Sequence, residues 1–222
     1  MIIALLVMMT LVAYFGGVYV ENRKVGNWIR FISDLLLVGI VALIITNNSY
    51  HFGMEQQVET STTQISSASP QKQMPFLLYE PLGTAGKEQV YLYKTLASGK
   101  IKHTTPDLTT NKVVRTKLSP KLITNKKVWR YKNSFYRVMF SVSGNEGTRI
   151  KTTNTFYIPK NWMVLSTKEA KKLKDPKIQN KLKQEVKLKM ISAMKNHPQM
   201  TKEQQQALIA QYQNQAIEKL VK

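Results

Sequence analysis

The densest group of residues that could do chemistry is a run of basic and aromatic side chains. It reads Lys126-Lys127-Val128-Trp129-Arg130-Tyr131-Lys132 and continues as Phe135-Tyr136-Arg137. Aromatic rings interleaved with cations on strands resemble the platforms on which single-stranded nucleic acids stack. Alternation also points rings inward and cations outward in any small basic sheet domain, and we favour this second interpretation. The candidate contacts for an anionic partner in this run are Lys126, Lys127, Arg130, Lys132 and Arg137.

A second basic group lies between residues 168 and 195, where ten lysines face only three acidic residues. A solvated charged face is the ordinary interpretation of such a run. Its functional counterpart is contact with an anionic wall polymer or lipid headgroups, at about 1 kcal/mol per lysine near a charged surface. The candidate contacts here are Lys171, Lys172, Lys174 and Lys181.

Residues that could support catalysis are few. Four carboxylates could in principle be paired for glycan chemistry: Glu80, Glu88, Asp107 and Glu146. Because acids are sparse among many lysines, we favour ordinary surface ion pairs. The three histidines are not at metal-ligand spacing, and the absence of cysteine excludes thiolate chemistry. We therefore predict no catalytic site, no cofactor and no metal.

The loop Gly83-Thr84-Ala85-Gly86-Lys87 is similar to a phosphate-binding glycine loop. A P-loop needs four residues between its glycines and a hydroxyl residue after the lysine, whereas two intervene here and Glu88 follows. We therefore predict a hairpin turn.

Two apolar segments begin the chain. Residues 2–20 would form a helix of roughly 28 Å, long enough to span the hydrocarbon of a bilayer. Residues 28–45 form the second segment, in which Arg30 and Asp34 lie four apart and can pair at the interface. We expect two transmembrane helices within residues 1–49, joined by a short basic loop at residues 21–30.

The charges that flank these segments predict their orientation. The loop at 21–30 holds Arg23, Lys24 and Arg30, whereas residues 46–71 hold no Lys or Arg. Because basic residues near helix ends remain cytoplasmic, we expect both termini to be extracytoplasmic in the cell membrane. Thirty basic and eleven acidic residues follow residue 50, which favours an anionic partner. The outside location argues against nucleic acid as that partner.

Residues 50–74 are polar and could form either a stalk or an edge strand. Between 75 and 165, short β-prone runs alternate with turn residues, which predicts a small antiparallel sheet or barrel. The predicted strands are 76–79, 90–96, 113–118, 128–131, 135–142, 155–158 and 162–165. In the fifth strand, apolar residues at every second position predict one buried face. Loops at 97–100 and 143–147 are predicted to be hairpin turns.

Residues 166–222 are predicted to be helical. Ser166 with Glu169 has the pattern of a capping box, Asp175-Pro176 marks a second helix start, and Thr201 with Gln204 marks a third. Apolar residues at spacing four predict that the last two helices form a hairpin that turns through Asn196-His197-Pro198. The fold class expected is therefore α+β: a two-helix transmembrane hairpin, a β-rich domain and a C-terminal helical hairpin.

Several motifs resemble a known family. They are the two-helix start, His51-Phe52-Gly53-Met54, the block from Met74 to Glu88, and Thr110-Asn111-Lys112-Val113. Together they resemble an uncharacterised family of two-pass membrane proteins from lactic-acid bacteria, a domain of unknown function similar to DUF4811. The resemblance covers most of the chain and implies a Gram-positive cell envelope. It implies no activity and no catalytic residues.

The function that we expect is that of a non-enzymatic, membrane-anchored envelope protein. Its basic domain would contact an anionic polymer or another membrane protein. An envelope enzyme acting on glycan or phosphate ester would instead need a cleft where at least two of the four carboxylates converge. A membrane-tethered nucleic-acid binder would need exposed aromatic rings near Trp129.

Overall fold

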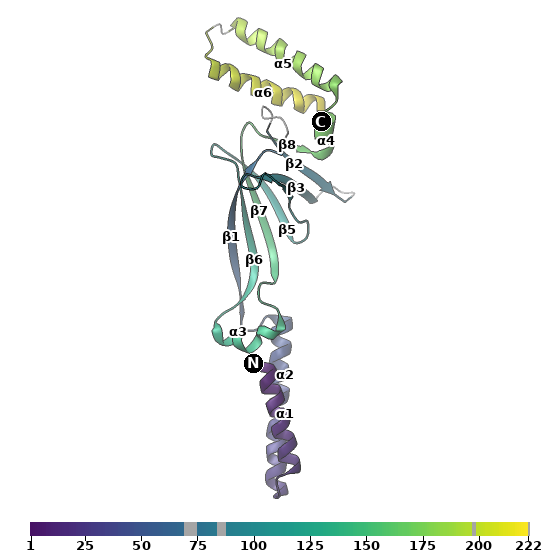
Figure 1. Ribbon diagram of the computed structural model, residues 1–222, viewed down its shortest axis with the longest axis vertical. Coiled ribbons are helices and arrows are strands. Elements are labelled where there is room, and N and C mark those ends of the chain that lie inside the picture. Colours follow the sequence, from purple (N-terminus) through teal and green to yellow (C-terminus); the bar gives the residue numbers. More distant parts are fainter. Residues whose placement is uncertain (69–74, 84–87, 197–198, 222) are drawn as a thin grey trace. The chain divides into compact units, whose positions relative to one another are not determined.

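The computed structural model describes residues 1–68, 75–83, 88–196 and 199–221. The fold is of the expected α+β class, with N-terminal helices, a curled sheet that forms a half-barrel, and C-terminal helices (Figure 1). Contacts divide the chain into two units: residues 1–59 with 126–151, and residues 60–125 with 152–222.

The first two helices are α1 (Ile2–Val18) and α2 (Arg23–Tyr50). Among the described residues, α2 alone has the length and apolar composition of a clear membrane span. The apolar helix α1 is shorter, with 17 residues, and ends two residues before the predicted boundary. Asn22 caps α2 by accepting the Lys24 N–H at 3.1 Å. The predicted basic loop at 21–30 is therefore mostly helical, and its charges lie on the first turns of α2.

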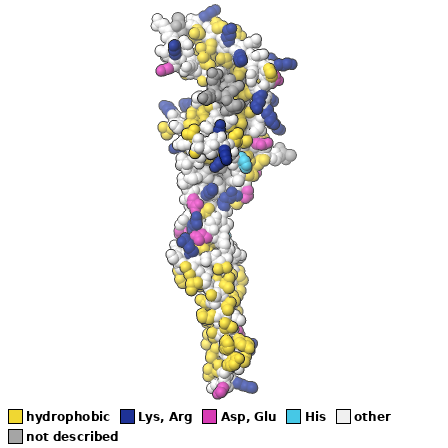
Figure 2. Space-filling view, in the orientation of Figure 1, with side chains coloured by type: hydrophobic (Ala, Val, Ile, Leu, Met, Phe, Trp, Pro, Cys, Tyr) yellow, Lys and Arg dark blue, Asp and Glu magenta, His cyan; other side chains and the backbone are white. Residues whose placement is uncertain are grey.

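Small residues let α1 and α2 approach closely. A Cβ on Gly26 would lie 2.7 Å from the Gly16 carbonyl oxygen, so neither position tolerates a side chain without separating the helices. The predicted pair between Arg30 and Asp34 is confirmed at 3.9 Å, with both side chains exposed. The helices form an antiparallel hairpin whose outer surface is apolar (Figure 2).

The half-barrel is one mixed sheet in the order β5-β7-β6-β1-β3-β2-β8, with β4 paired to β3. Its strands are β1 (Met54–Ser66), β2 (Phe76–Leu82), β3 (Glu88–Thr95), β4 (Ile101–His103), β5 (Thr109–Thr116), β6 (Lys121–Tyr131), β7 (Arg149–Pro159) and β8 (Met163–Ser166). The prediction of an antiparallel sheet or barrel is confirmed only in part, because β3 pairs antiparallel with β1, β2 and β4, whereas β2 pairs with β8 and β5 with β7 in parallel. Parallel partners come from distant parts of the chain, which local patterns do not encode.

Of the two alternatives for residues 50–74, a strand forms over residues 54–66, but it is not the predicted edge strand, because β1 lies between β6 and β3 in the sheet. Residues 69–74 lie outside the described part of the chain. The predicted turn at 97–100 joins β3 to the short strand β4, which the sequence analysis missed. Residues 84–87 of the glycine-rich loop also lie outside the described residues.

The segment 135–142 corrects another prediction, since it is not a strand. It forms α3 (Ser134–Phe140) followed by the 3-10 turn η1 (Ser141–Ser143). Asn133 caps α3 by accepting the Tyr136 N–H at 3.1 Å. The Tyr136 ring packs over Gly53, whose φ of 78° and missing Cβ leave room for it. The predicted turn at 143–147 consequently joins η1 to β7 and closes no hairpin.

Alternate side chains of β7 point into the core of the second unit. Thr152, Asn154, Phe156 and Ile158 are buried, and the residues between them are only partly so. Phe156 and Ile158 pack with side chains of β1, β2, β3 and β6 and with Trp162.

The C-terminal helices are α4 (Thr167–Lys172), α5 (Pro176–Asn196) and α6 (Lys202–Val221). The capping box of Ser166 and Glu169 is confirmed, as are the predicted starts at Pro176 and near Thr201. Leu182 of α5 and Ile217 of α6 pack against Phe76 and Leu165 of the sheet. The predicted turn through His197-Pro198 lies outside the described residues.

Candidate functional site

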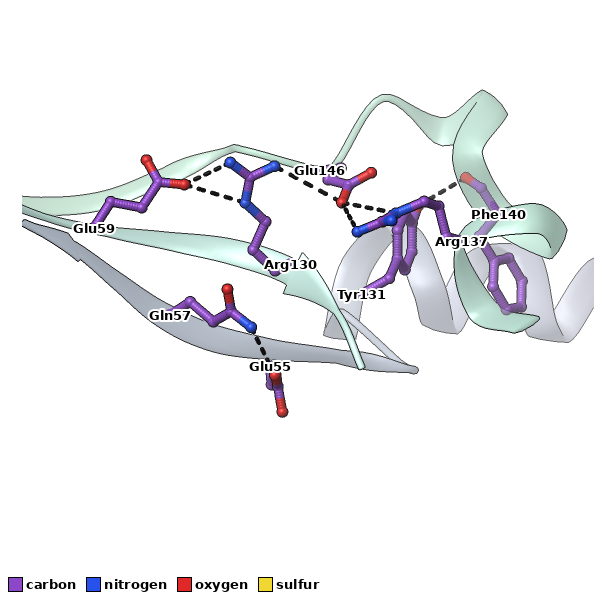
Figure 3. Close-up of polar contacts among 8 residues, drawn as sticks. All are labelled: Glu55, Gln57, Glu59, Arg130, Tyr131, Arg137, Phe140 and Glu146. Carbon is purple, nitrogen blue, oxygen red and sulfur yellow. Dashed lines mark hydrogen bonds and ion pairs between the residues drawn. The ribbon is translucent and has the colours of Figure 1, made fainter. Parts of the chain in front are cut away.

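Four charged side chains from four segments of the first unit form a continuous cluster (Figure 3). Arg130 on β6 donates from Nε to Glu59 Oε1 on β1 at 3.2 Å, and its Nη1 lies 3.8 Å from Glu146 Oε1. Arg137 on α3 reaches the same Glu146 oxygen from Nη2 at 2.9 Å and donates to it from Nε at 3.1 Å. Glu146 lies in the segment between η1 and β7, and its Oε1 contacts both arginines.

The electrostatics of this charged cluster, Glu59, Arg130, Arg137 and Glu146, are balanced internally. The hydrogen bond and the charge of Glu59, with a smaller contribution from Glu146, raise the pKa of Arg130 above its ordinary value. Two guanidinium groups face two carboxylates, so neither arginine presents an uncompensated charge. All four side chains retain solvent contact, which limits the stabilising effect of each pair. The cluster links β1, β6, α3 and the segment before β7. Two of the nine candidate anion contacts, Arg130 and Arg137, are paired within it.

In the same unit, a buried polar group fixes the end of α2. The Asn47 side chain is fully buried, donates to the Phe52 carbonyl at 2.8 Å and accepts from Ser143 Oγ at 2.9 Å. Tyr131 Oη donates to the Phe140 carbonyl at 2.8 Å. Each buried polar atom named here has a hydrogen-bond partner, so these bonds hold α3 and η1 against the end of α2.

The aromatic rings of the basic run differ in exposure, since Phe135 is exposed whereas Trp129 and Tyr131 are partly or fully buried. The Trp129 ring is partly buried and stacks on His51, with centroids 4.2 Å apart and an interplanar angle of 13°. Tyr131 is buried. A ring face already covered by a protein ring cannot receive a base, so His51 blocks one face of Trp129.

The remaining candidate lysines of this region, Lys126, Lys127 and Lys132, are exposed. Those of the C-terminal region, Lys171, Lys172, Lys174 and Lys181, are also exposed. The two regions differ in what their acids do. Glu169 is used in the capping box, Asp175 accepts the Lys177 N–H at 2.8 Å, and Glu185 lies 3.9 Å from Lys189 and 3.7 Å from Lys219.

The carboxylates proposed for glycan chemistry are spread over the chain. The register of β2 and β3 places Glu80 opposite Val90 and Glu88 opposite Leu82, so these two carboxylates are diagonal neighbours on one face. Both side chains are exposed. Glu146 belongs to the charged cluster. Among the described residues, no three His, Cys, Asp or Glu side chains come together as a metal site.

One cavity of about 350 Å³ lies in the first unit, between the ends of α1 and α2 and the turn η1. Its walls are mainly apolar, with Asn47 and Ser143 at a polar edge. The lining includes Ile2, Ile3, Ile44, Ile45, Phe140 and Val142. None of the four candidate carboxylates lines this cavity.

A family model described as "Domain of unknown function (DUF4811)" matches residues 22–173. The chain belongs to the DUF4811 family. The DUF4811 match begins just before α2 and ends after α4, so it contains the whole charged cluster. The α5–α6 hairpin lies beyond it. Neither the curated proteins nor the solved structures include a match to this chain.

Sequence reasoning missed two features of the DUF4811 domain. Glu59 was assigned to a polar stretch, although Glu55, Gln57 and Glu59 at every second position indicate one face of a strand. The second feature is a buried polar network in the half-barrel, where Asn154 Nδ2 donates to Asn111 Oδ1 and Thr124 Oγ1 donates to Asn154 Oδ1, both at 2.9 Å. Its signal was the polar residues at alternate, inward positions of β7.

Proposed function

We propose that this protein is a two-pass membrane protein of the cell envelope that presents a basic extracytoplasmic surface to an anionic polymer. Both α1 and α2 cross the bilayer, and both termini lie outside. The polymer contacts the lysines of α4 and α5.

The α1–α2 hairpin supports the membrane part of this proposal. At about 1.5 Å per residue, the 17 residues of α1 reach roughly 25 Å, close to the hydrocarbon thickness when flanking residues adjust. Hydrophobic side chains cover the outside of both helices (Figure 2), and the helices meet through small residues, as membrane helices do. Arg23, Lys24 and Arg30 near the turn favour a cytoplasmic turn.

The proposal that α4 and α5 bind the polymer is supported by the contacts that the acidic side chains of these helices make. Ten lysines between residues 168 and 195 face three carboxylates, and each of these carboxylates is engaged in a cap or an ion pair. Lys171, Lys174 and Lys181 are exposed and available to a partner. In the charged cluster, by contrast, the arginines are paired. We therefore place the polymer on α4 and α5.

Single-cysteine labelling in intact cells tests the topology, and the absence of native cysteine makes it clean. Ser61→Cys, at an exposed position of β1, should react with a membrane-impermeant thiol reagent. The matched variant Glu21→Cys, at the turn between α1 and α2, should react only after lysis. The reverse pattern would overturn the extracytoplasmic location.

Two variants with equal charge change test the binding surface. We expect Lys171→Gln/Lys174→Gln/Lys181→Gln to weaken binding of poly(glycerol phosphate) roughly 100-fold, since each lysine contributes about 1 kcal/mol. The control is Lys126→Gln/Lys127→Gln/Lys132→Gln, which should change affinity by less than about threefold. Wild-type binding should weaken steeply with salt, and neutral dextran should not bind. Salt-insensitive binding, or a larger effect of the control, would contradict the proposed surface.

Vesicles containing phosphatidylglycerol, compared with the polymer, distinguish lipid headgroups from polymer as the source of the phosphates. Another membrane protein remains the alternative partner, held by the exposed apolar face of α2. It would co-purify with the chain in detergent, and the lysine variants would not release it.

A further inference from the structure

The surface of α3 and η1 has three distinct faces. One is buried and places Tyr136, Met139 and Phe140 in the apolar cluster of the first unit. A second is polar and carries Ser134, Arg137 and Ser141, with Arg137 paired to Glu146. The third is apolar but exposed.

The exposed apolar face consists of Phe135, Val138 and Val142, which are 66%, 49% and 62% exposed. Residues separated by three and four positions lie on the same side of a helix, so these three side chains form a continuous stripe. The buried face already attaches α3 to the unit. Packing within the chain therefore does not account for the stripe.

Aromatic rings extend this stripe toward the end of α2. The Phe135 and Tyr136 rings are 5.6 Å apart, and the Tyr136 and Phe52 rings are 5.8 Å apart. Phe52 is 45% exposed and Tyr50, the last residue of α2, is 79% exposed. Aromatic side chains at the end of an apolar helix are typical of the membrane–water interface.

The cavity connects the stripe to the apolar surface of α1 and α2. Val142 of η1 lines it together with Ile3 and Ile45, which are themselves exposed on the helices. In water, these apolar walls would remain solvated, which the hydrophobic effect disfavours. At a membrane surface, acyl chains would cover them.

We propose that α3 and η1 lie in the plane of the membrane interface, as a third membrane contact beside α1 and α2. Phe135, Val138 and Val142 face the acyl chains of the surrounding lipids, which also fill the cavity. Arg137 and the exposed Lys132 lie at the level of the headgroups. This inference rests on the proposed insertion of α1 and α2. Contact of α3 with the membrane–water interface would then determine how the first unit is oriented on the membrane.

Fluorescent probes on single cysteines test this inference in the full chain, reconstituted in phosphatidylcholine–phosphatidylglycerol vesicles. An environment-sensitive dye is attached at Val138→Cys or Val142→Cys, and at the polar-face controls Ser134→Cys and Ser141→Cys. Val38→Cys, exposed in the middle of α2, reports the anchor. All five substituted side chains are exposed, so we expect the substitutions to preserve the fold.

Nitroxide lipids labelled high on the acyl chain should quench the dye at 138 and 142 about threefold more than at 134 and 141. The dye at 38 should be quenched most by nitroxides near the bilayer centre. Equal, weak quenching at 134, 138, 141 and 142, with position 38 quenched, would overturn the interfacial position of α3 alone. Absence of quenching at 38 would overturn the membrane insertion on which the inference rests.

Discussion

The two basic regions of this chain carry similar residue types but use their acids differently. In the charged cluster, Glu59 and Glu146 pair with Arg130 and Arg137 across strands, a helix and a loop. Around α4 and α5, the carboxylates of Glu169 and Asp175 instead accept the backbone N–H groups of Ser166 and Lys177 at helix starts. The first arrangement pairs both arginines with carboxylates, whereas the second uses the carboxylates at helix starts and leaves Lys171, Lys174 and Lys181 exposed. A count of charges in sequence therefore does not reveal which positive charges can bind a partner.

The difference also separates stability from binding. Removing an acid from the charged cluster leaves arginines facing one another in the fold. Removing lysines from α4 and α5 reduces repulsion between like charges and leaves the packing against the sheet unchanged. We therefore expect opposite consequences from substitutions in the two regions.

The largest effect on stability is expected for Glu146→Lys, because it places a third cation between Arg130 and Arg137. Given the partial exposure of Glu146, we expect a loss of roughly 1 to 2 kcal/mol. Hydrogen exchange of residues 126–151, in the full chain in nanodiscs, measures the change. Arg137→Glu added to this variant restores an opposite pair and should recover part of the loss. If protection is unchanged in Glu146→Lys, the cluster does not stabilise the first unit.

A smaller loss, about 1 kcal/mol, is expected for Glu169→Ala, since it removes the reciprocal bonds of the capping box. Glu169 Oε2 accepts from the Ser166 N–H at 2.7 Å. The control Glu185→Ala removes the same charge but only the long ion pairs with Lys189 and Lys219, at 3.9 and 3.7 Å, so it should cost less than about 0.5 kcal/mol. Hydrogen exchange of residues 163–173 compares the two. Equal losses would mean that charge, and not capping, is the function of Glu169.

The capping box shows what a local pattern can predict. Ser166 and Glu169 are three residues apart, and their interaction needs nothing from the rest of the chain. The starts of α5 and α6 and most strands of the half-barrel were predicted for the same reason. Arg130 was predicted as a candidate anion contact, and its partner Glu59 could not be foreseen from the local pattern because it lies 71 residues away in sequence. Sequence reasoning therefore found the basic residues of the site but could not determine which of them are paired.

The error at α3 has a different cause. Tyr136, Val138, Phe140 and Val142 alternate as in a strand, but Phe135, Val138 and Val142 also fit a helical stripe. Two tertiary features decide between these periods: the cap by Asn133 and the packing of Tyr136 over Gly53. The parallel pairing of β2 with β8 likewise depends on contacts between distant segments. At such positions the sequence pattern fits more than one structure, so it cannot determine which one forms.

Alkaline pH provides a further test, because it would weaken polymer binding in two ways. Lysines lose their charge, and the core of the second unit loses stability. Burial, with a smaller contribution from the nearby Tyr79, raises the pKa of Tyr91 above its ordinary value of 10.0. The stability that this provides is complete below about pH 10 and is lost as the pH rises through the pKa in the folded state.

Tyr91→Phe separates the two contributions. It removes the titrating hydroxyl, so unfolding of the second unit should depend less steeply on pH above about pH 10. The decline in polymer binding should remain, because the lysines still titrate. Urea unfolding and binding, both measured from neutral to alkaline pH, give the two slopes. An unchanged slope of stability would show that Tyr91 does not link folding to pH.

The smallest effect on stability is expected for the triple variant Lys171→Gln/Lys174→Gln/Lys181→Gln, whose free energy of unfolding should change by less than about 0.5 kcal/mol. The side chains are exposed, and the nearby acids cap helices or pair with other lysines. The same variant is expected to lose polymer binding. If it instead unfolds more easily, its binding defect would reflect altered structure, and the contrast between a paired cluster and an available basic surface would fail. Unchanged stability with lost binding would assign these lysines to the partner, because their charge would then serve nothing within the fold.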